Sequence, residues 1–401
     1  TLMTTRSKAI TRDTVVAVIG VILVAFNMRT AVSGLSPIYD IVSVDVPLGL
    51  DVRALLGALP PFAFVIGGLI TPRVTRRIGL EWNLVVLIAL MVIGHVVRGF
   101  ATTWLTIVIG SALVLIGSGM GNVSLPPVIK RYFPHNVGPM SSLYITFVSI
   151  SSIIPPLIAV PLSHAASWRV ALGVWVFLAL GALVPWLLEI RSGRQSDAPS
   201  VTASTTIALR RSPTAWAIAT TLTVSSITGY GMFAWLPTIA TESAGLTDAG
   251  GGIALALFAG AGLPLALGIP VIASRIRNVA NLVYVGAFLT VVGALGLSYL
   301  PTHAPYLWAF IFGSGPLLFP LALVLINLRT ESPSASLQLS AFAQFFAYVV
   351  AGTVAPLLGW ARAITGGWQL GLTAMACTGF AALWAARVLA RNHTVESELR
   401  N

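Results

Sequence analysis

Arg29 is the residue best suited to bind a charged molecule, because it stands inside an apolar run long enough to span a bilayer. Residues 21–27 precede it and residues 31–38 follow it, and both segments are largely apolar. A guanidinium in the hydrocarbon region costs at least about 2.5–3.5 kcal/mol, so such a residue faces a bundle interior or a water-filled cavity. Arg29 is too deep in its run for the side chain to reach the interface. The sequence therefore predicts that Arg29 lines a site for a ligand or an ion.

Three kinds of partner could balance the charge of Arg29. A buried carboxylate could pair with it, or backbone carbonyls and polar side chains could solvate it without a ligand. All twelve Asp and Glu residues fall in loops or at the ends of apolar runs, which disfavours the first interpretation. We favour the third, in which the missing counter-ion is the substrate, either a small anion or a molecule with a strongly polarised oxygen.

Other polar side chains inside apolar runs are consistent with a cavity around Arg29. On a continuous helix Arg29 would share a face with Thr30, Ser33 and Pro37, whereas Asn27 would lie on another face. Each polar residue could equally form a hydrogen bond between helices. Position 229, at an offset of 200 from Arg29, is Gly, so one half of the protein is expected to supply the charge. The candidate substrate-binding residues are Arg29, Asn27, Thr30, Ser33, Asn122, Tyr144, Tyr230, Trp235, Gln344 and Tyr348.

The sequence offers one candidate for proton coupling. Carriers that couple to protons often use a carboxylate inside the membrane as a relay, and no apolar run holds one in its interior. An unperturbed His titrates in the physiological range. His95 stands near the outer end of its run beside Arg98, where packing is the alternative role. We expect passive anion movement, or symport with a proton that travels on the substrate or on His95.

No residue pattern predicts an enzyme, a cofactor or a metal site. The sequence contains no phosphate-binding loop of the Walker type, no dinucleotide-binding Gly pattern and no metal-spaced set of Cys and His. Cys377 is the single cysteine, so neither an intrachain disulfide nor a Cys-based metal centre can form. Transport driven by ATP in this chain is excluded, and no catalytic residue is assigned.

The composition places these residues in a membrane. Of the 401 residues, 56% are hydrophobic and 9% are charged, against about 25% charged residues in a soluble domain. So little charge cannot cover a surface in water, and lipid must cover it instead. The formal net charge of +11 fits basic cytoplasmic loops, and no nucleic-acid partner is expected. A membrane enzyme or a receptor is disfavoured, because clustered titratable groups and a large extramembrane domain are both missing.

Twelve apolar runs have the length of a transmembrane helix, about 20 residues. They are approximately residues 14–38, 51–71, 82–100, 104–130, 138–163, 168–189, 213–240, 249–273, 279–300, 304–328, 334–361 and 367–390. With the N-terminus inside, eighteen of the 23 Lys and Arg residues fall inside, four fall outside, and Arg29 remains. Because Lys and Arg concentrate in cytoplasmic loops, the sequence predicts a multi-pass protein of the bacterial inner (cytoplasmic) membrane with both termini cytoplasmic. The first run is read as a retained span rather than a signal peptide.

The runs fall into two related halves. A polar stretch divides the chain into an N-terminal six-helix bundle (1–190), a cytoplasmic linker (191–212) and a C-terminal six-helix bundle (213–401). Trp168 and Trp368 open corresponding runs 200 positions apart, and Pro156 and Pro356 repeat that offset. An even number of spans in each half gives a parallel repeat. The expected fold is therefore an all-α membrane protein with two pseudo-symmetric six-helix bundles around a central cavity, the major facilitator fold.

Several motifs lie in both halves of the chain. They are residues 27–37 (Asn-Met-Arg-Thr-Ala-Val-Ser-Gly-Leu-Ser-Pro), residues 121–134 (Gly-Asn-Val-Ser-Leu-Pro-Pro-Val-Ile-Lys-Arg-Tyr-Phe-Pro), residues 138–140 followed by Tyr144, residues 233–237 and residues 344–348. Together they resemble the cyanate/2-nitroimidazole permease family of the major facilitator superfamily. The turn after the second run departs from the superfamily signature, because Thr71-Pro72-Arg73 stands where an Asp usually precedes the first Arg. That acid often helps to latch the two halves together.

The resemblance implies transport of small polar or anionic molecules, since cyanate uptake and nitroimidazole export both occur in the family. We therefore predict a secondary transporter that moves a cyanate-, nitro- or carboxylate-like solute by alternating access, with Arg29 holding the substrate. The alternative is a drug or multidrug exporter for small organic compounds, in which a buried Arg would be a poor neighbour for a cation. The expected partners are a small-molecule substrate and the lipid bilayer, and the protein is expected to be a monomer without a cofactor.

Overall fold

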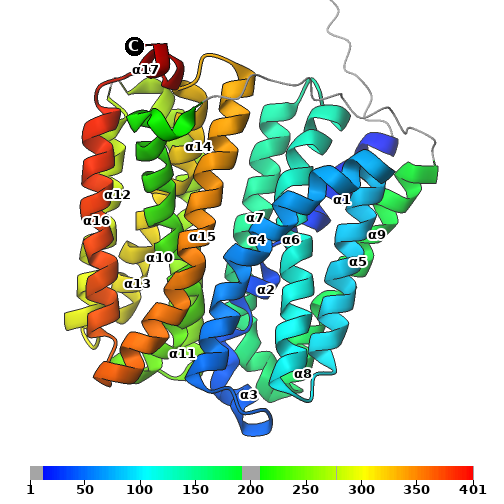
Figure 1. Ribbon diagram of the computed structural model, residues 1–401. Helices are drawn as coiled ribbons and strands as arrows, with labels where there is room; N and C mark the ends of the chain where they lie inside the picture. The colour runs from blue at the N-terminus through cyan, green and yellow to red at the C-terminus, as the bar shows by residue number, and fades with distance from the viewer. Residues whose placement is uncertain (1–11, 192–207, 277, 401) are drawn as a thin grey trace, which may run out of the picture.

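The computed structural model describes residues 12–191, 208–276 and 278–400. Those residues form helices and short connections and contain no β-strand (Figure 1). The first part of the chain forms α1 (Arg12–Asn27), α2 (Thr30–Ser33), η1 (Ser36–Ile38), α3 (Tyr39–Asp45), α4 (Leu50–Ile78), α5 (Leu80–Gly99), α6 (Trp104–Tyr132), α7 (Val137–Ala165), α8 (Trp168–Gly173) and α9 (Trp175–Arg191). The second part forms η2 (Leu209–Arg211), α10 (Pro213–Ala244), α11 (Asp248–Arg275), α12 (Ala280–Tyr299), α13 (Pro305–Ser314), η3 (Gly315–Leu317), α14 (Leu318–Leu328), α15 (Pro333–Thr365), α16 (Gln369–Leu389) and α17 (Val395–Arg400).

Eleven of the twelve expected spans are found among the described residues by length and composition, and the twelfth has a matching helix. Eleven segments are long and apolar enough to cross a membrane. The twelfth is α10, which has 32 residues but contains more Thr and Ser. Its hydroxyls do not need water, because Thr221, Thr223 and Thr228 donate hydrogen bonds to carbonyls four residues earlier in the same helix. A helix of this kind can remain buried among its neighbours although its composition is less apolar.

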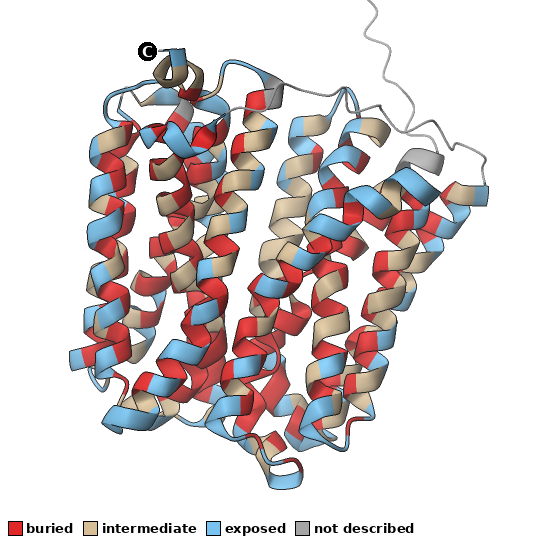
Figure 2. Cartoon of the chain, viewed as in Figure 1, coloured by how far each residue is buried: buried red, intermediate tan, exposed pale blue. Residues whose placement is uncertain are grey.

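Many large apolar side chains of the long helices are exposed, and exposed positions occur along the length of these helices (Figure 2). Phe177, Phe288 and Phe380 are 73%, 65% and 70% exposed. Exposed rings of this size would be unfavourable in water, at roughly 25 cal/mol for each Å² of apolar surface. They are expected in a bilayer, where the surrounding chains are equally apolar. The exposed side chains therefore support the prediction, made from composition, that lipid covers this surface.

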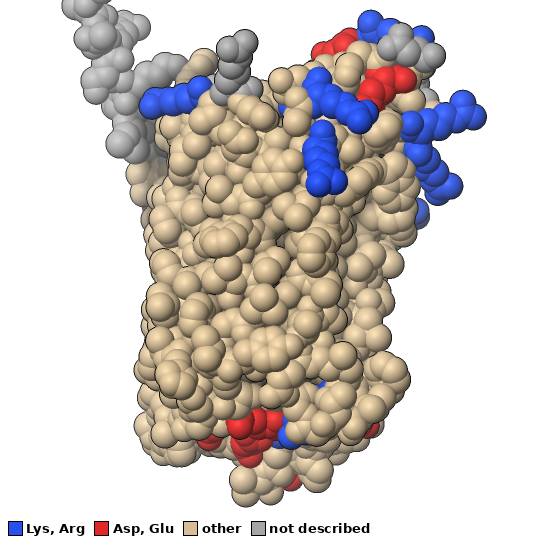
Figure 3. Space-filling model, turned by 90° about the vertical axis from the view of Figure 1, so that its left-hand side faces the viewer, with Lys and Arg blue, Asp and Glu red and all other residues tan. Residues whose placement is uncertain are grey.

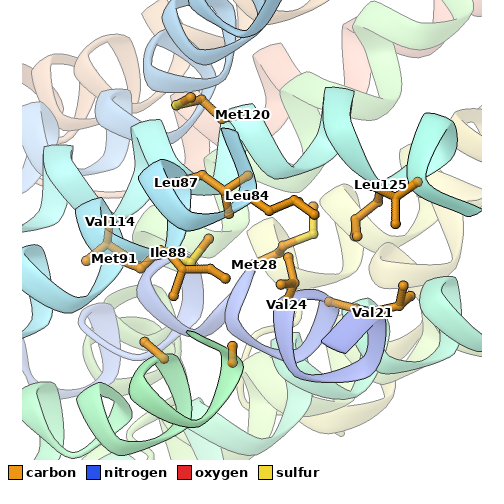
Figure 4. Packing of buried hydrophobic residues seen from close by; sticks show 14 of the residues in the cluster. Val21, Val24, Met28, Leu84, Leu87, Ile88, Met91, Val114, Met120 and Leu125 are labelled. Carbon is orange, nitrogen blue, oxygen red and sulfur yellow. The ribbon is translucent and has the colours of Figure 1, made fainter. Parts of the chain in front are cut away.

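The helices form two groups, coloured blue to teal and green to red in Figure 1. We call α1–α9 the N-terminal group and α10–α17 the C-terminal group. In the first group Val21, Val24 and Met28 pack against Leu84 and Leu87 of α5, all almost completely buried (Figure 4). The expected linker lies mostly outside the described residues.

The two ends of the molecule differ in charge, as Figure 3 shows on one face. We call the end that carries α17 and the turns after α4 and α6 the basic end, and the opposite end the far end. The basic end includes Arg73, Arg76, Arg77, Lys130, Arg131, Arg275, Arg329, Arg387, Arg391 and Arg400. The far end carries Asp40, Asp45, Asp51, Glu242 and Asp248, together with Arg53, Arg169 and Arg362. The start of α1 and helix α17 both lie at the basic end (Figure 1).

The acid missing from the turn after α4 has a counterpart in the first turn of α5. Glu81 is 3% exposed and its carboxylate lies 2.7 Å from Arg131 Nη1. The Tyr132 hydroxyl donates a hydrogen bond of 3.0 Å to the same carboxylate. These contacts join α5 to α6 inside the N-terminal group. They fix the turn within that group rather than latching it to the C-terminal group.

Helix α17 covers part of the basic end of the C-terminal group. Its Val395 is fully buried. The Glu398 carboxylate accepts hydrogen bonds from the Thr214 backbone nitrogen at 3.1 Å and from the Thr214 hydroxyl at 2.6 Å. Nearby, a hydrogen bond from Thr394 and the charge of Arg400 hold the pKa of the Glu331 carboxyl below its ordinary value. The end of the chain is thus attached to the start of α10.

At the far end of the N-terminal group, one carboxylate accepts hydrogen bonds from both an indole and a guanidinium. Asp45, at the end of α3, accepts a hydrogen bond of 2.8 Å from Trp168 Nε1 and one of 2.9 Å from Arg169 Nη1. Arg169 also lies over the Trp168 ring, 4.2 Å from its centroid. This cluster, which we call the first indole clamp, joins the end of the first span to the start of the sixth.

The C-terminal group has an equivalent cluster. Glu242 of α10 accepts hydrogen bonds of 2.8 Å from Trp368 Nε1 and of 2.8 Å from Arg362 Nε. This second indole clamp joins the seventh span to the eleventh and the twelfth. The sequence repeat, in which Trp168 and Trp368 were matched, is therefore visible as the same chemistry at corresponding places in the two groups.

Replacing Trp168 or Trp368 by Phe should lower the free energy of unfolding by about 1 kcal/mol in each case. The ring packing is largely kept, whereas the carboxylate loses one hydrogen bond and retains its Arg partner. Thermal unfolding of the purified protein would measure the loss. Trp384→Phe is the matched control, because Trp384 is 45% exposed on α16 and has no carboxylate partner among the described contacts. Equal melting temperatures for all three variants would contradict the role of the clamps.

Candidate substrate-binding site around Arg29

The first span is interrupted at Arg29. Helix α1 ends at Asn27 and α2 begins at Thr30, so Met28 and Arg29 form a turn between them. The Arg29 carbonyl accepts hydrogen bonds of 3.0 and 3.3 Å from the backbone nitrogens of Val32 and Ser33. The expectation of one continuous helix through Met28 and Arg29 is therefore wrong. Broken membrane helices are tolerated where the backbone is buried in protein or lines a cavity.

Three of the predicted site residues stabilise this interruption. The Thr30 hydroxyl donates a hydrogen bond of 3.1 Å to the Asn27 carbonyl, and the Ser33 hydroxyl donates one of 3.3 Å to the Arg29 carbonyl. Asn27 Nδ2 donates a hydrogen bond of 2.8 Å to the Leu23 carbonyl, while its Oδ1 is buried without a partner. All three side chains are at most 1% exposed. Their observed contacts fix the backbone beside Arg29.

The Arg29 side chain lies among aromatic rings. Its guanidinium carbon is 4.8 Å from the centroid of the Phe64 ring, within the range of a cation–π interaction. Phe64 is 6.0 Å from the ring of Tyr230 and 6.0 Å from the ring of Tyr348, and these two rings are 6.1 Å apart. Each pair meets edge to face. The rings come from α4, α10 and α15, so both groups contribute to the surroundings of Arg29.

Three tyrosines surround the charge of Arg29. The Tyr230 phenol of α10 is close enough to the Arg29 guanidinium for an electrostatic interaction. Tyr144 of α7 and Tyr348 of α15 are close enough to interact with it electrostatically. Four of the predicted site residues are thus brought together, namely Arg29, Tyr144, Tyr230 and Tyr348. Phe64 was missed, because nothing in the sequence distinguishes it from a packing or lipid-facing Phe.

Arg29 has no carboxylate partner among the ion pairs of the described residues. Those pairs involve Arg53, Arg131, Arg169, Arg362 and Arg400. The interpretation that Arg29 locks two helices together through a buried Asp or Glu is therefore not supported. The side chain is half-buried, and its charge faces phenol hydroxyls and ring faces. These groups can hold a guanidinium in place without neutralising it.

The remaining predicted residues lie apart from this cluster or make other contacts. Trp235 is fully buried, donates a hydrogen bond of 2.9 Å to the Ala355 carbonyl and lies 5.1 Å from the Trp368 ring. Gln344 donates a hydrogen bond of 2.8 Å to the Ser340 hydroxyl on its own helix. Asn122 is half-buried on α6. His95 is fully buried toward the far end of α5, with Nδ1 3.3 Å from the Leu172 carbonyl.

The two groups meet closely on the far side of Arg29. The Ser36 hydroxyl of η1 donates a hydrogen bond of 2.7 Å to the Phe233 carbonyl of α10. At Gly57 a Cβ atom would lie 2.6 Å from Ala234 Cβ and 2.7 Å from Ala355 Cβ, so only glycine permits this approach without a shift. We call these contacts the far-end seam. The side of Arg29 that faces the far end is closed by them.

On the side of Arg29 that faces the basic end, the side chains of α7 are more exposed. On α7, residues 151 and 152 are buried, whereas residues 143–150 are all half-buried. This stretch includes Tyr144 and extends toward the basic end. The ribbons of α4 and α15 also diverge in that direction (Figure 1). The surroundings of Arg29 are therefore less tightly packed toward the basic end than at the far-end seam.

Comparison with known proteins identifies the architecture. Residues 18–356 match the Major Facilitator Superfamily. The chain is 30% identical over 367 residues to the 2-nitroimidazole transporter of Escherichia coli (strain K12), covering 91% of this chain and 93% of that protein. It is 25% identical over 356 residues to the cyanate transport protein CynX of the same organism, with coverage of 87% and 90%.

A solved structure shows the same fold. The peptide transporter POT in complex with sulfate superposes with a TM-score of 0.73 at 13% identity, covering 94% of this chain and 96% of that one. At that identity the likeness concerns the fold alone. With the family match and the apolar helices, it follows that the chain is a multi-pass membrane transporter and not an enzyme. The chain belongs to the Major Facilitator Superfamily of secondary transporters.

Proposed function

We propose that this transporter moves a small anion, or a small molecule with a nitro or carboxylate group, across the inner membrane by alternating access. The observation that carries the proposal is Arg29, a half-buried guanidinium inside a membrane span without a carboxylate partner among the described residues. A charge in that position is costly unless a ligand or water compensates it. An anionic or strongly polarised oxygen would supply charge-assisted hydrogen bonds to the guanidinium.

The rings around Arg29 favour a small, flat substrate. Phe64, Tyr230 and Tyr348 present edges and faces close to the guanidinium, and the tyrosine hydroxyls can donate to oxygen atoms of a ligand. Relatives of this chain are named for 2-nitroimidazole and for cyanate. Both molecules are small, and they are planar or linear. A substrate of that kind could contact Arg29 and the rings together.

Alternating access is supported by the uneven packing of the two groups. The far-end seam closes one side of Arg29, while α7 is less tightly packed toward the basic end. Lys and Arg concentrate at the basic end (Figure 3), which supports a cytoplasmic location for that end by the positive-inside rule. The structure would then represent a state whose site communicates with the cytoplasm. The N-terminal bundle (1–190) and the C-terminal bundle (213–401) would be the moving units.

A thermal-unfolding screen of the detergent-purified protein tests the proposed substrate class. The panel contains cyanate, nitrite, nitrate, small carboxylates, nitroimidazoles and several cationic drugs. A ligand present at 100 times its dissociation constant stabilises the folded state by about 2.7 kcal/mol, which is readily measured. We expect stabilisation by at least one anion or nitro compound and none by the cations.

The opposite pattern would favour the drug exporter. The aromatic rings beside Arg29 could stack against a neutral or cationic organic molecule, and cationic drugs would then stabilise the protein. In that case Arg29 would be a structural residue solvated by Tyr230 and its neighbours. The next experiment would measure transport of the stabilising compound in proteoliposomes, with the compound added first outside and then inside the vesicles.

A further inference from the structure

A buried guanidinium lies near the far end of the N-terminal group. Arg98, in the last turn of α5, is 1% exposed, and its Nε and Nη1 atoms have no hydrogen-bond partner. The side chain packs against α6, where a Cβ at Gly110 would lie 2.8 Å from Arg98 Cγ. Buried polar groups are nearly always hydrogen-bonded. Two unsatisfied donors on one buried cation therefore call for an explanation.

Further polar groups near Arg98 also lack partners. Ser111 of α6 is 3% exposed, and its hydroxyl is unsatisfied. His95, one turn before Arg98, has no partner at Nε2. The phenol of Tyr39 is close enough to Arg98 for an electrostatic interaction, and its ring lies 5.3 Å from the guanidinium carbon of Arg53 at the far end. Positive charge and hydroxyl groups therefore extend inward from the far end.

Two of these groups, Tyr39 and Ser111, line a small, partly open cavity. Its volume is about 20 Å³, room for about one water molecule. Tyr39, Ser36 and Ser111 supply polar groups to its wall. The C-terminal group contributes Tyr230, Phe233 and Ala234, and the other lining residues belong to the N-terminal group. Separation of the two groups at the far-end seam would therefore remove one wall and turn the cavity into a pocket open to the far end.

We propose that Arg98, Tyr39 and Ser111 form an outer binding site for a small anion, only partly open in this structure and fully accessible when the far-end seam opens. The unsatisfied Arg98 donors and the Ser111 hydroxyl would bind the anion, and Tyr39 would stand between them and the far end. Tyr230 lines the cavity and contacts the Phe64 ring over which Arg29 lies, so the outer site adjoins the Arg29 site. The idea that the substrate binds at the outer site before it reaches Arg29 rests on the proposed function, whereas anion binding at Arg98 does not.

Nitrate binding to full-length variants tests the outer site. Thermal unfolding is measured against sodium nitrate, with sodium gluconate at equal ionic strength as the reference. The background is Arg29→Met with Gly57→Leu, because a side chain at Gly57 collides with Ala234 and Ala355 and holds the seam open. We expect saturable stabilisation by nitrate in this background. Adding Arg98→Gln should abolish this stabilisation. Adding Ser111→Ala should raise the dissociation constant for nitrate about tenfold, which is the effect of losing one hydrogen bond to a charged ligand.

Ser118→Ala is the matched control, since Ser118 is a buried serine of α6 whose hydroxyl already donates 2.9 Å to the Val114 carbonyl. It should leave the nitrate response unchanged. If Arg98→Gln does not fold, Ser111→Ala against Ser118→Ala decides the question. A nitrate response equal to that of gluconate in the Arg29→Met, Gly57→Leu background would overturn the outer site, and so would an unchanged response after Ser111→Ala.

The two proposals fail in different ways. If nitrate stabilises the wild type and the Arg29→Met background does not respond, Arg29 binds the anion and the outer site falls. If Arg29→Met leaves the dissociation constant of the wild type unchanged while Arg98→Gln abolishes binding, the outer site stands and the role proposed for Arg29 falls.

Discussion

Replacing Arg29 by Met should weaken binding of the anionic or nitro ligand by about 100-fold or more. Removing one partner of a buried, hydrogen-bonded charge pair costs roughly 2–5 kcal/mol. Met fills a similar length but offers the ligand no donor. The dissociation constant is obtained from the ligand dependence of thermal unfolding, with whichever panel compound stabilises the wild type. Arg29→Lys should lie between the two, because a Lys keeps the charge and loses the planar pair of donors.

The same substitution should not destabilise the protein without ligand. Arg29 has no carboxylate partner among the described residues, so Met removes a charge that the fold itself does not neutralise. The melting temperature of ligand-free Arg29→Met should therefore equal or exceed that of the wild type. Arg73→Met makes the same chemical change at an exposed position of the basic end and should leave ligand binding unchanged. A large loss of stability together with unaltered ligand binding would mean that Arg29 serves the fold.

Gly57→Leu should shift the transporter toward a state that is open at the far end. A Cβ at this position would lie 2.6 and 2.7 Å from the Cβ atoms of Ala234 and Ala355, and the larger side chain extends the collision. Overpacking a close contact costs about 1–3 kcal/mol, which corresponds to a population shift of roughly 5- to 150-fold. The two groups can relieve it by separating at the seam.

Thiol labelling would measure that shift. Cys377, the single native cysteine, is replaced by Ala, and Ser36→Cys places a thiol at the seam, next to Phe233. A maleimide that does not cross membranes should label this thiol slowly in the parent and many times faster after Gly57→Leu. Gly68→Leu is the matched control on the same helix, since the nearest atom to its added Cβ is 3.9 Å away, on Val123. Equal labelling rates for the two leucine variants would contradict the proposed opening.

The fold could be predicted from the sequence because a bilayer leaves few alternatives. A membrane span must satisfy its backbone internally, so an apolar run of sufficient length becomes a helix. The polar character of α10 did not obscure its length, and the offset between Trp168 and Trp368 identified the two repeats. The sequence could not show that Trp168 and Trp368 each donate a hydrogen bond to a carboxylate. Asp45 and Glu242 differ in residue type and are separated by 197 positions rather than 200, so the indole clamps emerge only in the structure.

The candidate site was predicted in part. Arg29 is conspicuous because a charge inside an apolar run is rare, and Tyr144, Tyr230 and Tyr348 stood out as polar groups in spans. The interruption of the helix at Met28 and Arg29 was not predicted, because neither residue is Gly or Pro, the usual signals of a break. Helical periodicity was therefore applied across a turn between α1 and α2. The sequence does not identify Phe64 as a site residue, because its position over the Arg29 guanidinium is known only from the structure.

The unpaired state of Arg29 has an electrical consequence for a carrier of the proposed kind. An empty site carries one positive charge, and a site filled by a monovalent anion carries none. The loaded protein would then change conformation without moving net charge through the membrane field, while the return of the empty protein would move one charge through part of it. A full crossing is worth about 2.3 kcal/mol per 100 mV for each elementary charge. Membrane potential would accordingly act on the return step and set the turnover rate through it, rather than through the passage of the substrate.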